Sequence, residues 1–301
     1  MPLSDDYLKY PKRRHGMDHG RYDWSILPKR KPVEWPGRAR VALWITVALE
    51  WFPLDQQGKP FKPLGSLQTA YPDLRHYTLR DYGNRVGVFR VMKALEKHGI
   101  RASAAVNAAV ALRYPSLIER LKEKRWELMG HGLDMDHLHY EGMSGERELI
   151  ARCVSVFKPR GWLSPARSES SQTPDLLAEA GVEYVCDWVN DDMPYEFKAA
   201  GRTMHAMPLS GDIDDAALLL GMHHDEDEVY AQLTDQFDGL YEEASTHGGR
   251  IMSVTLHPWA IGQPYRIGTL ERALDYFMRH PGVWPATGAQ ILDAWRATTT
   301  A

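Results

Sequence analysis

Cysteine is scarce in this sequence of 301 residues, which contains only Cys153 and Cys186. Two cysteines so far apart do not make the disulfide framework of a small secreted protein, and they fit reduced thiols buried in a cytoplasmic one. Residues 1–21 are polar and basic and lack the apolar core of a signal peptide. No stretch of the chain is long and apolar enough to cross a bilayer. We therefore expect a cytoplasmic protein with no membrane partner.

An excess of positive charge and the common cofactor motifs are lacking as well. The formal net charge is -4 and the pI is near 6.4, with no basic block, so nucleic acid is not an expected partner. No G-x-G-x-x-G follows a strand and no phosphate-binding loop carries its lysine, so we expect no nucleotide cofactor. Neither cysteine lies in a glycine-rich turn and no G-x-S-x-G appears, which disfavours a serine or cysteine nucleophile.

The chain does contain a repeated alternation of short apolar runs and amphipathic segments. The uncharged run Val41–Leu49 is rich in β-branched residues and predicts a strand buried on both faces. Seven or eight strand–helix units around one core predict an α/β fold, a (β/α) barrel with a parallel sheet, as a single domain over residues 39–301. The further strands are expected at residues 102–107, 126–130, 161–163, 183–188, 204–209, 251–256 and 283–286, with helices that include 229–243 and 270–278.

Two segments do not fit this alternation. Residues 1–38 contain Pro28, Pro32 and Pro36, which block regular structure, and we expect an irregular arm lying across the domain or on a neighbouring subunit. A disordered tail is an equal alternative for about the first fifteen residues. Residues 51–82 read as one long polar loop, followed by a helix that ends at Gly99. Loops of that length inside a domain usually carry function, so we expect this loop to shape substrate specificity.

Polar side chains follow several predicted strands at the point where each strand ends. Glu50 follows the first strand, His131 lies between two glycines after the third, and His257 ends the strand at 251–256. In a barrel the active site lies where strands end and loops begin. A carboxylate and two imidazoles at one mouth could bind a divalent metal ion, or could share acid and base work on a bound water. Each of these residues could instead have a purely structural role, as a helix cap, an ion-pair partner or a turn residue.

Two other segments are weaker candidates for a functional site. The cluster of Asp134, Asp136, His137 and His139 resembles a metal site, but a solvated loop explains it equally well. The segment 83–87 opens the predicted helix and could hold an anion on its backbone N–H groups.

Five motifs occur in order over residues 32–295. They are Asp81–Arg90 with its Tyr-Gly-Asn-Arg core, Gly130-His131-Gly132, Gly161-Trp162-Leu163, Asp187–Pro194, and Leu256-His257-Pro258 followed by residues 261–264. Together they resemble the allantoinase-like homologues of the polysaccharide deacetylase superfamily. The resemblance implies a distorted, incomplete (β/α) barrel and hydrolysis of C–N bonds.

The resemblance also implies site residues. Metal-binding members of the superfamily use an aspartate pair after the first strand, where this chain has Glu50, and two histidines after the third. His131 matches the first histidine, but Met135 stands at the place of the second, and thioether sulfur is a poor ligand for such metals. Glu50, His131 and His257 are therefore the expected catalytic residues and the candidate ligands of a zinc-like divalent ion, unless the enzyme works without metal. Substrate-binding roles are expected for Arg85, Trp162, Asp191 and Asp215.

These expectations amount to a hydrolase of a small cyclic amide, ureide or imide. Glu50 would take the proton from the attacking water or help to hold a metal, and the two histidines would bind the metal or stabilise the oxyanion. The alternatives are a carbohydrate N-deacetylase and, from another class, an inactive barrel that serves as a binding module. The resemblance also suggests a homo-oligomer, a dimer or a tetramer, in which the aromatic residues of the arm (Tyr7, Tyr10, Tyr22 and Trp24) could make a swapped contact.

Overall fold

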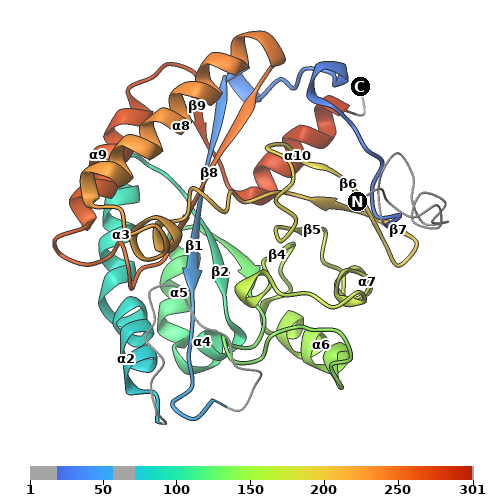
Figure 1. Cartoon of the computed structure of the whole chain (residues 1–301), viewed down its shortest axis with the longest axis vertical. Coiled ribbons are helices and arrows are strands. Elements are labelled where there is room, and N and C mark those ends of the chain that lie inside the picture. Colours follow the sequence, from blue (N-terminus) through green and yellow to red (C-terminus); the bar gives the residue numbers. More distant parts are fainter. Residues whose placement is uncertain (1–18, 57–71, 300–301) are drawn as a thin grey trace, which may run out of the picture.

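The computed structural model describes residues 19–56 and 72–299, and it shows one curled sheet surrounded by helices (Figure 1). Eight strands follow one another in the order β6-β7-β5-β4-β3-β2-β1-β8, and β9 pairs with β1. All pairings are parallel except that of β6 with β7. Among the described residues no pairing joins β6 to β8, so the barrel is incomplete, as expected. The strands are β1 (Val41–Leu49), β2 (Ser103–Val106), β3 (Glu127–Gly130), β4 (Gly161–Trp162), β5 (Tyr184–Val185), β6 (Tyr195–Ala199), β7 (Arg202–Ala206), β8 (Arg250–Leu256) and β9 (Val283–Pro285).

Strand β1 is the centre of the sheet. All nine of its residues are buried, which explains why its sequence is apolar throughout rather than alternating. It pairs with β8 from Val41 to Val47, with β9 near its start and with β2 from Thr46 to its end. The carboxyl ends of β1, β2, β3 and β8 consequently meet at one edge of the sheet.

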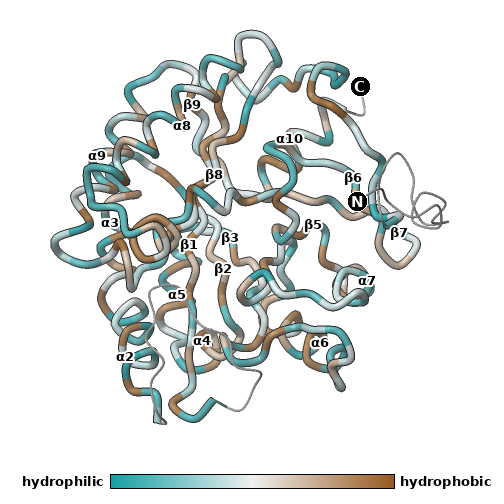
Figure 2. The backbone as a smooth tube through the Cα atoms, in the orientation of Figure 1, coloured by the Kyte–Doolittle hydropathy of each residue, from teal (hydrophilic) through white to brown (hydrophobic). Residues whose placement is uncertain are grey.

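Helices cover the outside of the sheet, and their inward faces supply the rest of the core. In Figure 2 the central strands are mostly hydrophobic, and hydrophilic stretches lie on the outer helices and loops. The largest hydrophobic cluster joins β1, β2 and β8 to α3, α5, α8 and α9. The helices are α2 (Leu74–Tyr82), α3 (Val88–Glu96), α4 (Ala108–Arg113), α5 (Pro115–Glu123), α6 (Glu146–Phe157), α7 (Thr173–Glu179), α8 (Glu226–His247), α9 (Ile267–Met278) and α10 (Gly288–Thr299). None of the helices in the described ranges has the length and apolar character needed to cross a membrane.

The described part of the N-terminal arm, residues 19–38, lies across its own domain. Trp35 is buried and donates its Nε1–H to the Arg250 carbonyl oxygen at 2.9 Å. Tyr22 packs edge-on against Trp188 and Tyr195. Tyr22 is thus occupied within its own chain, and Tyr7 and Tyr10 lie outside the described residues. Trp24 remains 60% exposed, so it is the arm's one described aromatic that is open to a second subunit.

Two secondary-structure elements differ from the sequence predictions. Residues 74–82, predicted as loop, form helix α2, which Asp73 caps by accepting the His76 N–H at 3.0 Å. The helix has no apolar stripe, since the buried residues on it are His76 and Arg80. Strand β6 was not predicted either, although its burial alternates as expected of an edge strand.

The segment Gly83–Gly87 also differs, because it is a π-helical turn inside a continuous helix rather than a helix start. Its backbone N–H groups are therefore not free at a helix N-terminus to hold an anion. Its glycines are required by packing: a Cβ on Gly87 would lie 2.0 Å from the Pro258 carbonyl oxygen. This close contact fixes α2 and α3 against the loop that follows β8.

Candidate active site

The strand ends bring the three expected catalytic residues together. Glu50, His131 and His257 directly follow β1, β3 and β8 and line one cavity of about 310 Å³. Asn107, which follows β2, connects two of these ends: its Oδ1 accepts the Trp51 N–H at 2.8 Å, and its Nδ2 donates to the His131 carbonyl oxygen. The structure therefore brings the three residues together at one mouth of the barrel.

The Glu50 carboxylate is buried among hydrogen-bond donors and positive charge. Its Oε2 accepts Arg80 Nε–H at 3.2 Å and Trp259 Nε1–H at 3.0 Å, and its Oε1 lies 3.7 Å from His257 Nε2. Burial raises the pKa of Glu50, but the charges of His257 and Arg80 outweigh burial, and the net pKa is lowered. Glu50 is therefore an ionised carboxylate whose Oε2 is already occupied.

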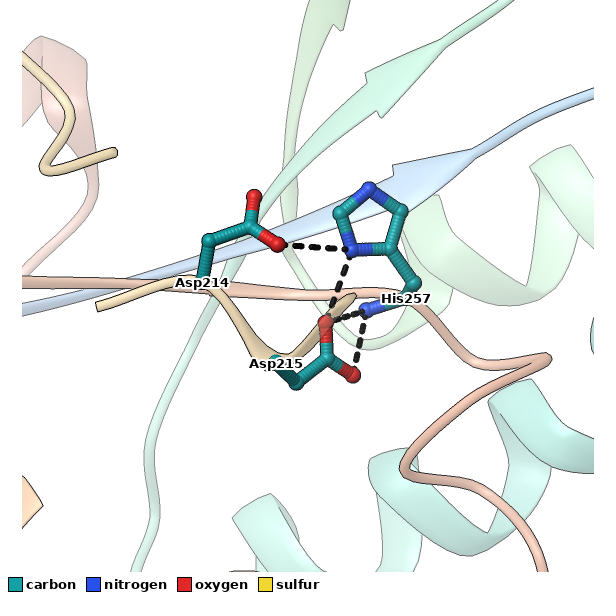
Figure 3. A group of neighbouring side chains, drawn as sticks. All are labelled: Asp214, Asp215 and His257. Carbon is teal, nitrogen blue, oxygen red and sulfur yellow. Dashed lines mark hydrogen bonds and ion pairs between the residues drawn. The ribbon is translucent and has the colours of Figure 1, made fainter. Parts of the chain in front are cut away.

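His257 is held as a cation by aspartates behind it (Figure 3). Its Nδ1 lies 2.7 Å from Asp215 Oδ1 and 3.6 Å from Asp214 Oδ1. Its backbone N–H also points to both oxygens of Asp215, at 2.8 and 2.9 Å. Burial lowers the pKa of His257, but Asp214, Asp215 and Glu50 outweigh it and raise the pKa to about 10. The bridge between Asp214 and Thr255 of β8 fixes the two aspartates in this position.

His131 has the opposite character. Its Nδ1 lies 2.6 Å from the Leu163 carbonyl oxygen, and its Nε2 is buried with no hydrogen-bond partner. Burial lowers the pKa of His131, and the charge of His257 lowers it further. Because a carbonyl oxygen only accepts, Nδ1 must carry the hydrogen. The Nε2 lone pair of neutral His131 is therefore available in the cavity.

Arg80 is a site residue that the sequence did not reveal. It is only 4% exposed, and its guanidinium lies over the rings of Trp259 and Phe52, with centroid distances of 4.1 and 4.7 Å. It belongs to helix α2, which was not predicted, and charged residues in a predicted polar loop draw no attention. A capping aspartate at Asp73, before the first helical residue, was the one available signal of that helix.

The four residues expected to bind substrate do not line the cavity. Arg85 is 72% exposed at its side chain and pairs with Asp81 at 3.4 Å. Trp162 is fully buried and donates Nε1–H to Ser164 Oγ at 3.0 Å. Asp191 forms an ion pair with Arg30 of the arm at 2.6 Å. Asp215 acts on His257 from behind, so it contributes to the site without facing the cavity. Part of the expected specificity loop, residues 57–71, lies outside the described residues.

The glycines beside His131 do not leave room for a ligand. A Cβ on Gly130 would lie 2.3 Å from the Trp162 ring, and a Cβ on Gly132 would lie 2.4 Å from Pro165. These glycines admit protein side chains, and Trp162 fills the space next to Gly130.

A metal ion does not fit the arrangement of these side chains. In the described part of the chain, the one group of three ligand atoms within 4.8 Å of one another comes from Asp214, Asp215 and His257. Two ligands of a tetrahedral zinc ion lie about 3.3 Å apart, whereas His257 Nδ1 and Asp215 Oδ1 are at the hydrogen-bond distance of 2.7 Å. At the expected ligands Glu50, His131 and His257, the buried Arg80 guanidinium would repel a cation, and Met135 lines the cavity where the second histidine would stand.

Comparison with known proteins supports the resemblance seen in the motifs. No family model matches the chain. A Schizosaccharomyces pombe protein provisionally named a polysaccharide deacetylase is 26% identical over 249 residues, which cover 72% of this chain and 75% of that protein. The crystal structure of PuuE allantoinase superposes with a TM-score of 0.82 at 27% identity, covering 91% of this chain and 96% of that one. A Pseudomonas aeruginosa structure, also provisionally named a polysaccharide deacetylase, gives a TM-score of 0.79 at 26% identity, covering 87% and 93%.

The two solved structures share the fold, and the similarity spans most of the chain, as the five motifs do. By fold and sequence together, the chain is similar to the polysaccharide deacetylase superfamily, with likeness to its allantoinase-like branch.

Proposed function

We propose that this chain is a hydrolase that opens the ring of a small cyclic amide, ureide or imide. Similarity to the superfamily supports hydrolysis of a C–N bond other than a peptide bond. The cavity of about 310 Å³ supports a small substrate, since it lies at the lower end of the usual range for ligand sites. The likeness to PuuE allantoinase, whose name denotes action on a ureide ring, supports the cyclic class.

One observation carries the proposal: two histidines in the same cavity have opposite protonation states. His131 is neutral with a free Nε2 lone pair, and His257 is a cation whose Nε2–H lies on the side of Glu50 and the cavity. Pairs of titratable groups whose environments separate their pKa values provide a base and an acid at one pH. His131 is thus suited to be the base and His257 the acid.

The chemistry follows from these protonation states. His131 Nε2 takes a proton from water, whose oxygen attacks the ring carbonyl carbon. The positive charges of Arg80 and His257 stabilise the oxyanion that forms. When the C–N bond breaks, His257 donates its Nε2 proton to the leaving nitrogen, and transfer of the proton from His131 to His257 restores both groups. Glu50, which we had expected as the base, instead holds Arg80 and His257 in place, because its Oε2 is occupied and its pKa is lowered. No step requires a metal.

The test is mass spectrometry of products after incubation with cyclic ureides, cyclic imides and N-acetylated sugars. We expect a cyclic compound to gain the mass of one water, with the activity unchanged by a chelator. His131→Gln should remove turnover and keep the fold, whereas His223→Gln, in the exposed turn before α8, should keep both. Loss of acetyl from a sugar would replace the proposal with N-deacetylation. Turnover by His131→Gln at the wild-type rate would refute the assigned base.

A further inference from the structure

Outside the lining of this cavity lies a pair of acidic residues that the proposed chemistry does not use. Glu169 and Asp187 line a second cavity of about 470 Å³ together with Tyr22, Arg167 and Trp188. Glu169 Oε2 accepts Trp188 Nε1–H at 3.0 Å. The remaining oxygens, Glu169 Oε1 and Asp187 Oδ2, are buried and receive no hydrogen bond from a donor group.

The two buried carboxyl groups line the same cavity, and the charge of Asp187 raises the pKa of Glu169. An ionised carboxylate only accepts hydrogen bonds, so two of them can bond only through a proton carried by one. A single shared proton satisfies both of the buried oxygens that otherwise have no partner. Two carboxyl groups in one cavity lining, each with a buried oxygen that no donor reaches, therefore indicate an acid pair that shares one proton.

Asp187 is connected to the proposed base through one peptide group. Its Oδ1 accepts the Ser164 N–H at 2.8 Å. The Leu163 carbonyl oxygen, which fixes the Nδ1 hydrogen of His131, belongs to the same planar peptide. Asp187 and His131 consequently hold opposite ends of one rigid unit, and a rotation of that unit would move the hydrogen bond that selects the His131 tautomer.

We propose that Asp187 is a positioning residue for His131, acting through the Leu163–Ser164 peptide, and that the proton it shares with Glu169 keeps it in place. The role in turnover rests on the proposed function, whereas the proton sharing and the link to His131 do not. When the shared proton leaves, the two carboxylates repel each other, Asp187 shifts, and the peptide is released.

The environment of the pair supports this arrangement. Burial, followed by the charge of Asp187, raises the pKa of Glu169 to about 8, and burial raises the pKa of Asp187 to about 6. The pair therefore carries one proton at neutral pH and loses it under mildly alkaline conditions. The other titratable groups that act on it are Arg21, Arg167, Cys186 and Tyr195; Arg21 is held by Asp175, and Arg167 donates to the carbonyl oxygens of Leu209 and Ser210.

The variant Glu169→Gln tests the pair, because its amide donates to Asp187 at every pH. In the wild type, kcat/KM should fall as the pair ionises near pH 8, and at pH 9 only about a tenth of the neutral value should remain. In Glu169→Gln the fall of kcat/KM near pH 8 should be absent. Only the fall at higher pH, where His257 loses its proton, should remain, and KM should equal that of the wild type. Glu119→Gln, the same change on the exposed face of α5, should follow the wild-type profile. A Glu169→Gln profile that coincides with the wild type would overturn the proposal.

A second measurement needs no substrate. Carboxyl ¹³C NMR should show in the wild type a group that titrates between about pH 6 and 9 and is missing in Glu169→Gln. The ¹⁵N resonances of His131 should report the Nδ1–H tautomer and change over the same pH range, but only in the wild type. If both signals behave in this way and no ring compound is turned over, the positioning link stands and the proposed function fails. If rings are opened but His131 does not respond to the pair, the link fails alone.

Discussion

Replacing Arg80 by methionine removes the guanidinium beside Glu50 and keeps much of the side-chain length. At the Nε–Oε2 distance of 3.2 Å the two charges attract by about 5 kcal/mol at an effective dielectric constant of about 20. His257 and Trp259 remain as partners of Glu50, so part of this attraction is compensated. We expect the free energy of unfolding to fall by about 3 kcal/mol, the lower end of the range for breaking a buried ion pair.

The matched control is Arg85→Met, five positions along the same helical run. Arg85 is largely exposed, and its pair with Asp81 is 3.4 Å long. An exposed pair contributes about 0–1 kcal/mol, so this variant should be nearly as stable as the wild type. Urea unfolding, followed by circular dichroism, measures both variants on the same scale. Equal stabilities for the two would refute the conclusion that Arg80 balances the buried charge of Glu50.

The pH dependence provides a second check on the same reasoning. In the wild type the pKa of Glu50 is lowered, so its contribution to stability is present above the pKa of the unfolded chain and is lost as pH falls through the folded-state pKa. Without Arg80 we expect the folded-state pKa of Glu50 to rise, because burial then dominates. The stability deficit of Arg80→Met should therefore shrink between pH 7 and pH 5. Glu50→Gln combined with Arg80→Met should recover about 2 kcal/mol relative to the sum of the single changes.

Three further predictions follow from other parts of the structure. Asp215→Asn should lower the pKa of His257 from about 10 and move the alkaline fall of kcat/KM to lower pH, and an unchanged pH–rate profile would contradict the role given to the aspartate. Gly87→Ala should cost at least about 1–3 kcal/mol in urea unfolding, because its Cβ would meet Pro258, whereas Gly268→Ala in α9, with nothing within 4 Å of the new Cβ, should be neutral or stabilising. Both cysteines are buried with raised pKa values, so a thiol reagent should label neither in the native protein and both after unfolding, and rapid native labelling would show that one is accessible.

The sequence predicted the barrel and the strand-end residues because both depend on patterns that burial enforces. β1 is apolar because both of its faces are covered, and the first polar residue after it, Glu50, stands out for that reason. Helix α2 could not be found in this way, since its inward positions carry His76 and Arg80 in place of an apolar stripe. Arg80 was missed because the site requires a charged residue at a buried helix position, where an apolar residue would have indicated a helix.

The substrate-binding expectations for Arg85, Trp162 and Asp191 show a different limit. A motif marks residues that matter together, but it does not say which face the cavity. Trp162 fills the space beside Gly130, and Asp191 fastens the arm through Arg30. Strand β6 did leave a signal, the alternation of Tyr195, Phe197 and Ala199 with polar residues, and it ends at a tight turn with positive φ at Ala200 and Gly201.

The pairing of β1 has a consequence for how the chain is made. The end of β1 pairs with β2, which is made early, but Val41 pairs with Arg250 of β8 and with Val283 of β9. The partners of the first part of β1 therefore emerge from the ribosome only when the chain is nearly complete. At about 5–20 residues per second, the apolar residues Val41–Ile45 wait on the order of ten seconds or more without these partners. This segment has the composition of an aggregation-prone strand, and during that interval it is exposed. The yield of folded protein should therefore depend on synthesis rate and on chaperones that cover β1 until β8 arrives.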